Sequence, residues 1–301
     1  MCINMKELIN NQNKPHIVCV VGPTASGKTA YAIELARSRG GEIVSCDSMQ
    51  IYKYMNIGTA KPTAEERAAV PHHMIDFVDP NTDYSVADFV SDAGRCISDI
   101  LSRGRLPVLC GGTGLYADSL INGIEFSEQK RDDEYRETLY KLAEEKGCEY
   151  IHGLLEKADP IESEKVHANN LKRVIRALEI CKTTGMTKTE ADKLAVREPA
   201  YDAEMYGLSL PREVLYDRIN RRVDLMISDG LENEVRQLID MGVRRNSTAM
   251  QAIGYKEMVR YIDGECDLNT AVEDIKRESR RYAKRQLTWF KRNKNIKWIQ
   301  L

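Results

Sequence analysis

The residues best suited to chemistry are Gly22-Pro23-Thr24-Ala25-Ser26-Gly27-Lys28-Thr29, which match the pattern G-x-x-x-x-G-K-[ST] in full. The pattern follows an apolar run, His16 to Val21, and precedes a helix-favouring stretch, Lys28 to Ser38. Backbone amides of such a turn point at phosphate oxygens, Lys28 adds a positive charge, and the Thr29 hydroxyl is placed to ligate Mg²⁺. This P-loop predicts a site for a diphosphate or polyphosphate, but not a particular reaction.

Two further groups follow predicted strands. Asp47 comes after Glu42 to Cys46, and Gly111-Gly112-Thr113 comes after Leu106 to Cys110. Strand ends form the crevice where α/β proteins bind ligands, so we expect both groups near the P-loop. From position alone Asp47 could be a Mg²⁺ ligand, a general base or a helix cap. Proteins that transfer a γ-phosphate need an acid at a strand end near Mg²⁺, and the third predicted strand carries Gly-Gly-Thr there instead.

Basic side chains recur in three segments that could meet phosphates. The first is a helix starting near Pro211, and the second runs from Asn169 to Glu179. Their candidates are Arg212, Arg218 and Arg222 in the first segment, and Lys172, Arg173 and Arg176 in the second. The third segment, Ala271 to Leu301, holds ten Lys or Arg against three Asp or Glu. Phosphate contacts and solvated helix faces both fit these patterns, so the residues leave the choice open.

Composition indicates an ordinary globular protein of 301 residues, with 42% hydrophobic and 30% charged residues and a net charge of −2. The eight cysteines are scattered without C-x-x-C spacing, which argues against a zinc site and for a reducing compartment. The start, Met1 to Lys6, does not resemble a signal peptide, and no apolar run reaches membrane-spanning length. We therefore expect a cytoplasmic protein without a membrane partner.

Strands alternating with helices predict a doubly wound α/β sheet. Between the second and third predicted strands, Val86 to Leu101 has the apolar spacing of an amphipathic helix, with Ser85 and Asp88 as a capping box. We expect residues 1–121 to form the first part of the core and 122–199 a mostly helical insertion. Residues 200–301 return to the core through a strand, Gly207 to Leu210, and end in basic helices. One face of the last helix is predicted to hold Val272, Ile275, Tyr282, Ala283, Gln286, Trp289 and Phe290.

Together, eight segments resemble the tRNA dimethylallyltransferases, also called tRNA isopentenyltransferases. They are GPTASGKT (22–29), SCDSMQIYKYMNIGTAKP (45–62), PHHMIDFVDP (71–80), GGTGLY (111–116), NNLKRVIRALE (169–179), RINRRVDLM (218–226), MQAIGYKE (250–257) and YAKRQLTWFKRN (282–293). They span nearly the whole chain in order, and DSMQIY, PHHMID and QAIGYKE have no role in a generic P-loop. The sequence ends soon after Trp298, without the zinc-finger extension of eukaryotic relatives, and so is similar to the bacterial type.

The resemblance implies a P-loop NTPase-like fold and a prenyl transfer. The donor would be dimethylallyl diphosphate, and the acceptor the exocyclic amine of the adenosine 3′ to the anticodon in tRNAs that read codons beginning with U. Diphosphate would be released, Mg²⁺ would be the cofactor, and the anticodon stem-loop of tRNA would be the partner of a monomeric enzyme.

The resemblance also implies a role for each matching residue. Asp47 would take the proton of the amine, Thr113 would lie beside the reacting groups, and Lys28 and Arg218 would stabilise the leaving diphosphate. Residues 22–29, Arg212, Arg218 and Arg222 would bind the diphosphate or a nucleotide, with the metal on Thr29. The implied tRNA contacts are Asp47, Ser48, Met49, Gln50, Thr113, Arg136, Lys172, Arg173, Val174, Ile175 and Arg176. Among these, Ser48 and Gln50 would hold the adenine edge, and the Trp289-Phe290 pair would help to grip the stem-loop.

Three other functions remain open at this point. A small-molecule P-loop kinase would consume the γ-phosphate of ATP, and an adenylate isopentenyltransferase would prenylate free nucleotides. A nucleotide-dependent RNA-binding switch would form no covalent product. The missing strand-end acid argues against the kinase, and the insertion and basic tail argue for tRNA over a free nucleotide.

Overall fold

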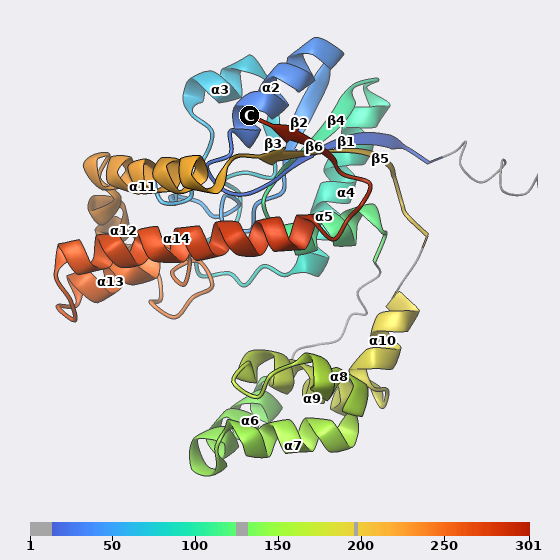
Figure 1. Ribbon diagram of the computed structural model, residues 1–301, viewed down its shortest axis with the longest axis vertical. Helices are drawn as coiled ribbons and strands as arrows, with labels where there is room; N and C mark the ends of the chain where they lie inside the picture. Colours follow the sequence, from blue (N-terminus) through green and yellow to red (C-terminus); the bar gives the residue numbers. More distant parts are fainter. Residues whose placement is uncertain (1–13, 125–131, 196–197) are drawn as a thin grey trace, which may run out of the picture. The chain divides into compact units, whose positions relative to one another are not determined.

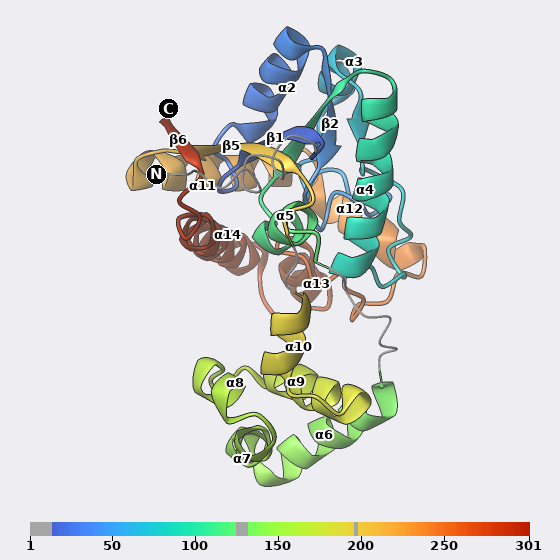
Figure 2. The ribbon, with the colours of Figure 1, turned by 90° about the vertical axis from the view of Figure 1, so that its right-hand side faces the viewer.

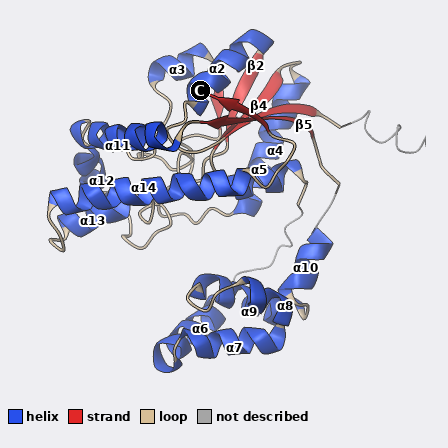
Figure 3. Cartoon of the chain, viewed as in Figure 1, coloured by secondary structure: helices blue, strands red, loops and turns tan. Residues whose placement is uncertain are grey.

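The computed structural model describes residues 14–124, 132–195 and 198–301. The chain divides into two units, one made of Met1–Ile121 with Pro199–Leu301 and the other of Asn122–Glu198. The first unit contains the sheet, and the described elements of the second are helices (Figure 1, Figure 3). The segment from Met1 to Lys6, which bears on the expectation of no leader, lies outside the described residues.

Six strands form one sheet in the first unit. They are β1 (His16–Val21), β2 (Gly41–Ser45), β3 (His72–His73), β4 (Leu106–Gly111), β5 (Asp202–Ser209) and β6 (Lys297–Gln300). Their order is β3-β2-β4-β1-β5-β6, and each described pairing is parallel. The predicted parallel α/β fold is therefore confirmed. Because β1 lies between β4 and β5, the loops after β1 and β4 leave the same edge side by side.

Helices cover both faces of this sheet (Figure 2). On one face, α2 (Lys28–Arg39) packs Ala32 and Ala36 against alternate residues of the strands. On the other face, α4 (Val86–Ser102) and α5 (Gly114–Ile121) bury Phe89 and Tyr116, whose rings stack at 4.3 Å. Burial on both faces explains why β1 and β4 read as continuous apolar runs. The capping box of Ser85 and Asp88 at the start of α4 is confirmed.

Three strand predictions need correction. β5 begins at Asp202, five residues before the predicted Gly207, and both β3 and β6 were missed. The start of β5 carries acidic instead of apolar side chains, so it lacks an apolar strand pattern. Asp202 pairs with His16, and Glu204 pairs with Arg39. β3 has two residues and β6 is an edge strand without an apolar run, so neither has a strong sequence signal.

Four of the remaining helices of the first unit surround a second core. They are α11 (Arg212–Ser228), α12 (Leu231–Asp240), α13 (Tyr255–Ile262) and α14 (Leu268–Phe290). The short helix α3 (Ala64–Ala69) buries no residue and lies beside α2. Helices α11 to α14 pack on the segment after β2 through Ile51, Tyr52, Met55 and Tyr255, all fully buried. The segment that carries Asp47 therefore continues directly into a rigid apolar core.

The second unit has a core of its own. Its helices are α6 (Asp133–Lys146), α7 (Cys148–Ala158), α8 (Pro160–Lys165), α9 (Leu171–Thr184) and α10 (Lys188–Ala195). Leu139, Ile151, Leu155, Val174 and Ile175 are buried together. No helix among the residues that the structure describes, in either unit, is long and apolar enough to cross a membrane.

A buried carboxylate joins α9 to α6 in this unit. Glu179 of α9 is fully buried and forms ion pairs with Arg136, whose Nη2 lies 2.6 Å away, and with Arg176. It also accepts a hydrogen bond from the Asp132 amide at 2.9 Å. Burial acts to raise the pKa of Glu179, but the hydrogen bonds from Arg136 and Arg176 outweigh it and lower the pKa to about 2.

We expect Glu179→Ala to destabilise the second unit by roughly 2–4 kcal/mol, because it leaves a buried acceptor site empty beside two unpaired guanidinium groups. Hydrogen exchange should show faster exchange in α9 and α6 and no change in β1. Glu145→Ala, at an exposed position of α6, is the control. Unchanged protection of α9 in the Glu179 variant would contradict this assignment.

Candidate active site

The loop after β1 takes the conformation that phosphate binding requires. Gly22 has φ 144°, and Gly27 and Ala25 are left-handed with φ 88° and 62°. A Cβ at Gly22 would lie 2.7 Å from the Leu208 carbonyl oxygen, so the loop passes close to β5 because this position is glycine. Gly27 provides no side-chain cap for α2, which leaves the first amides of the helix to a ligand.

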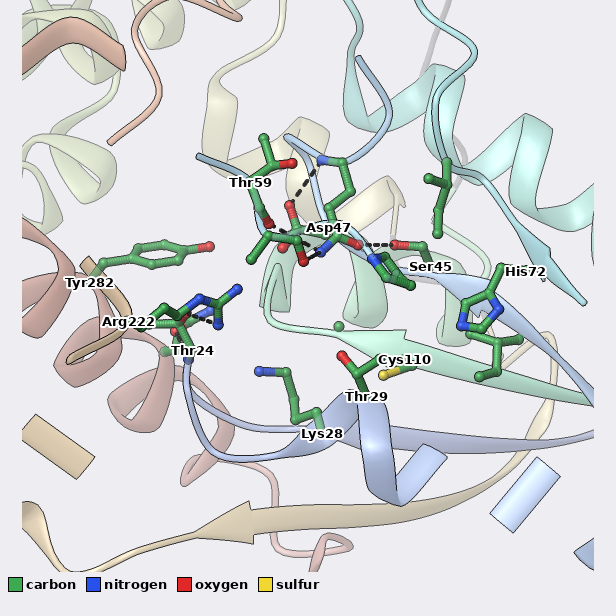
Figure 4. Close-up of a pocket in the computed structure, with 17 residues that line it drawn as sticks. Thr24, Lys28, Thr29, Ser45, Asp47, Thr59, His72, Cys110, Arg222 and Tyr282 are labelled. Carbon is green, nitrogen blue, oxygen red and sulfur yellow. Dashed lines mark hydrogen bonds between the residues drawn. The ribbon is translucent and has the colours of Figure 1, made fainter. Parts of the chain in front are cut away.

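Two basic side chains converge at this loop (Figure 4). The Lys28 Nζ donates to the Pro23 carbonyl at 2.6 Å, and the Arg222 Nη1 of α11 lies 3.4 Å from the Thr24 hydroxyl. Burial and, to a smaller extent, the neighbouring Arg222 guanidinium lower the pKa of Lys28 to about 8. Burial also lowers the pKa of Arg222. Both groups are therefore stabilised in their charged forms by a bound anion.

Asp47 lies opposite these cations, in the turn that follows β2. Its Oδ1 accepts hydrogen bonds from the amides of Met49 at 2.9 Å and Gln50 at 3.3 Å, so the carboxylate caps the turn. It also lines the pocket with Lys28, Thr29 and Arg222. Capping and chemistry were alternatives for Asp47 from the sequence. In the structure the same carboxylate caps the turn and lines the pocket, so the two are compatible.

The Gly111-Gly112-Thr113 loop is fixed against the Asp47 turn. The Thr113 amide donates to the Cys46 carbonyl at 3.2 Å, and its Oγ1 accepts from the Ser48 amide at 3.1 Å. A Cβ at Gly111 would overlap the Cys46 carbonyl, so glycine is required for this approach. Thr113 and Ser48 are therefore neighbours beyond the ends of the adjacent strands β4 and β2, so the Asp47 turn and the Gly111-Gly112-Thr113 loop lie at the same sheet edge, as expected.

Gln50 has a different role from the predicted one. Its Nε2 donates to the carbonyls of Thr59 and Ala60, at 3.2 and 3.1 Å, and its Oε1 accepts from the Ser45 hydroxyl at 3.2 Å. Both amide hydrogens are thus used inside the protein. The contact of Gln50 with an adenine edge stays a prediction, and in this structure the side chain positions the segment 56–62, which lines the pocket.

Two buried charges of opposite sign hold the same segment. Glu234 of α12 accepts hydrogen bonds from the amides of Asn56 and Ile57, both at 2.8 Å, and from the Tyr255 hydroxyl. Lys61 donates to the Tyr52 carbonyl at 2.6 Å and pairs with Asp76 at 2.7 Å. Their roles were not predicted from the sequence, although Lys61 and Tyr255 lie in the segments 45–62 and 250–257 that carried the resemblance, whereas Glu234 lies outside those segments.

A second pocket adjoins the one lined by Lys28, Thr29, Asp47 and Arg222, which we name the phosphate pocket after its P-loop wall. The two share Thr24, Asp47, Thr59, Arg222 and Tyr282 in their linings. The second pocket adds apolar side chains from α11 and its neighbours, namely Ile219, Val223, Met226, Ile253 and Ile275. The shared wall places Asp47 between a cationic pocket and a more apolar one.

The predicted arginines do not all reach the site. Arg222 lines both pockets, whereas Arg212 and Arg218 are exposed, and Arg212 lies over the Tyr216 ring at 5.1 Å. The proposed catalytic role of Arg218 is therefore corrected in favour of Arg222, one helical turn further along α11. The sequence places both on one face of the helix but does not show which helical turn lies beside the pocket.

The predicted RNA contacts of the second unit separate into two groups. Lys172 and Arg173 are exposed at the start of α9, where an RNA can reach them. Val174 and Ile175 are buried in the core, so side-chain contact with RNA is excluded for both. Arg136 and Arg176 are engaged by Glu179, which gives them a structural role not predicted from the sequence.

The Trp289-Phe290 pair is also corrected. Phe290 is fully buried, and the Trp289 Nε1 donates to the Asp118 carboxylate at 2.7 Å. These rings anchor the end of α14 to the core between the sheet and helices α4 and α5. Exposed basic residues of α14, such as Lys284 and Arg285, are the part of the tail that remains open to a partner.

The pocket has the donors that a hard divalent cation needs. The Thr29 hydroxyl and the Asp47 carboxylate line one cavity near Lys28, and Mg²⁺ prefers such oxygen ligands together with phosphate oxygens and water. The role of Thr29 as a metal ligand stays a prediction with which this lining is compatible.

The fold and the site define a class, a P-loop α/β protein whose strand-end residues surround a phosphate pocket. The family model described as IPP transferase matches residues 50–293, and that described as isopentenyl transferase matches residues 15–76. The chain belongs to the IPP transferase family.

Individual relatives agree with this assignment over nearly the whole chain. A tRNA dimethylallyltransferase of Acetivibrio thermocellus is 49% identical over 94% of this chain and 91% of its own. The solved tRNA isopentenylpyrophosphate transferase of Bacillus halodurans is 47% identical, with a TM-score of 0.72 over 95% of this chain and 90% of its own. A eukaryotic dimethylallyltransferase acting on tRNA is 30% identical, with a TM-score of 0.79 over 95% of this chain and 74% of its own.

We expect diphosphate to bind less tightly as the pH rises above about 8. Binding an anion stabilises charged Lys28 and so takes up a proton wherever the free enzyme has lost it. The affinity should fall by up to about tenfold per pH unit above the pKa of the free enzyme. Calorimetric titration with inorganic diphosphate from pH 7 to 9.5 measures this, and Lys28→Met supplies the background from the ligand's own ionisation. Parallel pH profiles in the two proteins would show that Lys28 does not titrate there.

Proposed function

We propose that this protein transfers a dimethylallyl group from dimethylallyl diphosphate to the exocyclic amine of the adenosine 3′ to the anticodon, in tRNAs that read codons beginning with U. Diphosphate is the leaving group. The observation that carries the proposal is the position of Asp47, which faces Lys28 and Arg222 across one pocket and also lines the adjoining pocket. The names of relatives similar over nearly the whole chain support the same reaction.

The P-loop side of the site suits a departing diphosphate. As the bond from the allylic carbon to oxygen breaks, negative charge grows on the diphosphate and positive character on the carbon. Loop amides, Lys28 and Arg222 stabilise that charge, and fixed donors in a partly buried site act more strongly than water does. Bound Mg²⁺, held through Thr29, would neutralise further charge on the same group.

The Asp47 side suits the acceptor. An adenine amine is a weak nucleophile, and Asp47 is placed to accept the proton that the nitrogen loses when it bonds to carbon. Thr113 and Ser48, held together beside Asp47, form the polar edge against which the base lies. A loop adenine that has left its stack at a cost of a few kcal/mol can enter through the second pocket.

The partner side of the proposal rests on exposed basic residues. Lys172 and Arg173 of α9 and Lys284 and Arg285 of α14 are open to phosphates of the anticodon stem-loop. We propose that the enzyme acts as a monomer, and light scattering on the assayed sample checks this.

The transfer is tested by incubating the protein with Mg²⁺, dimethylallyl diphosphate and unmodified tRNA, and then analysing the nucleosides by mass spectrometry. We expect prenylated adenosine from tRNA, little product from AMP, and loss of product when EDTA removes the metal. Absence of prenylated adenosine with tRNA would contradict the proposal, and efficient modification of AMP would favour an adenylate isopentenyltransferase instead.

For the role of Asp47 we expect Asp47→Asn to lower kcat about 10²–10⁴-fold, because the amide cannot accept the proton. Affinity for tRNA should change little, since an Asn Oδ1 can still accept from the amides of Met49 and Gln50. Asp47→Ala removes cap and base together, so the difference between the Ala and Asn variants measures the contribution of the cap. Near-normal turnover of the Asn variant would exclude Asp47 as the base.

A further inference from the structure

Gln286 of α14 bridges the two loops that hold opposite sides of the reaction. Its Oε1 accepts a hydrogen bond from the Thr24 amide at 2.8 Å, and its Nε2 donates to the Gly112 carbonyl at 3.0 Å. The residue is 5% exposed and lines the phosphate pocket. We propose that Gln286 is a positioning residue that sets the distance between the phosphate-binding loop and the acceptor-side loop; this inference rests on the proposed function.

The two partners require the chemistry of an amide side chain. Thr24 presents an N–H and Gly112 presents a carbonyl oxygen, so the side chain between them must accept at one end and donate at the other. A flipped amide would set N–H against N–H and oxygen against oxygen. Ionised Glu cannot donate and Lys cannot accept, so neither forms both bonds.

The packing around Gln286 leaves little freedom. A Cβ at Gly112 would overlap the Gln286 Nε2, and a Cβ at Gly114 would overlap the Trp289 ring three residues further along α14. Trp289 is itself fixed by its hydrogen bond to Asp118. One face of α14 is therefore held against the glycines of the Gly112–Gly114 loop.

From Gly112 the connection continues to the acceptor side. The next residue, Thr113, bonds to the Cys46 carbonyl and to the Ser48 amide, on either side of Asp47. A continuous chain of contacts thus runs from the P-loop to the Asp47 turn, through Thr24, Gln286, Gly112, Thr113 and Ser48. Since a misplacement of about 1 Å costs on the order of 10²-fold in rate, this bridge controls turnover.

The Gln286 bridge occupies a P-loop amide that could otherwise bind phosphate. The Thr24 amide is used by Gln286, so that amide holds the loop and not the phosphate. Loss of the bridge should therefore lower kcat while leaving affinity for inorganic diphosphate nearly unchanged. A purely structural role would lower melting temperature, diphosphate affinity and kcat together.

The test compares Gln286→Met with Gln237→Met, the same substitution at an exposed position of α12. We expect the Gln286 variant to lose about 10–100-fold in kcat, to keep its Kd for inorganic diphosphate within about twofold, and to melt close to the control. Site-resolved hydrogen exchange should be at least about tenfold faster at the Thr24 amide. Normal kcat, unchanged exchange, or a parallel loss of diphosphate binding would each overturn the inference.

Gln286→Glu gives a second, pH-dependent readout. When the introduced carboxyl is protonated it has one O–H donor and one carbonyl acceptor, as the amide does. Its kcat relative to Gln286→Met should therefore rise between pH 8 and pH 6, and no recovery would contradict the two-bond account. If the wild-type protein forms no prenylated adenosine, the proposed function fails, whereas the exchange and diphosphate measurements still decide the role of Gln286.

Discussion

Lys28 and Arg222 place two positive charges in one pocket, and burial lowers the pKa of both. A bound anion would offset this desolvation, so the pocket suits a densely charged ligand. The parallel sheet makes the arrangement possible, because it brings the ends of β1, β2 and β4 to the same edge. The P-loop, the Asp47 turn and the Gly111–Thr113 loop meet there.

The rest of the first unit holds these loops still. Glu234 and Lys61, buried charges of opposite sign, fix the segment 56–62 from within, and Gln50 joins that segment to the strand end before Asp47. Gln286 joins the P-loop to Gly112 from α14. Proton transfer and departure of diphosphate depend on distances that no flexible loop would maintain, and these buried polar contacts supply the rigidity.

Much of this could be predicted from the sequence, because local patterns carry it. The G-x-x-x-x-G-K-[ST] loop needs its glycines and lysine in order, and Asp47 and Thr113 directly follow apolar strands. The role of Gln286 could not be predicted in this way, since its partners lie 262 and 174 residues away along the chain. Arg218 and Arg222 share one face of α11 and differ in which helical turn reaches the pocket. Val174 and Ile175 are buried within the second unit. Tertiary structure therefore decides the roles of all four residues.

The central claim is that the P-loop holds the group that leaves and not a phosphate that is transferred. Phosphorus NMR during turnover of tRNA with dimethylallyl diphosphate tests this directly, with ATP present as a competing substrate. We expect one inorganic diphosphate for each prenylated adenosine and no phosphate released from ATP. Transfer or release of the γ-phosphate of ATP, without stoichiometric diphosphate, would contradict it.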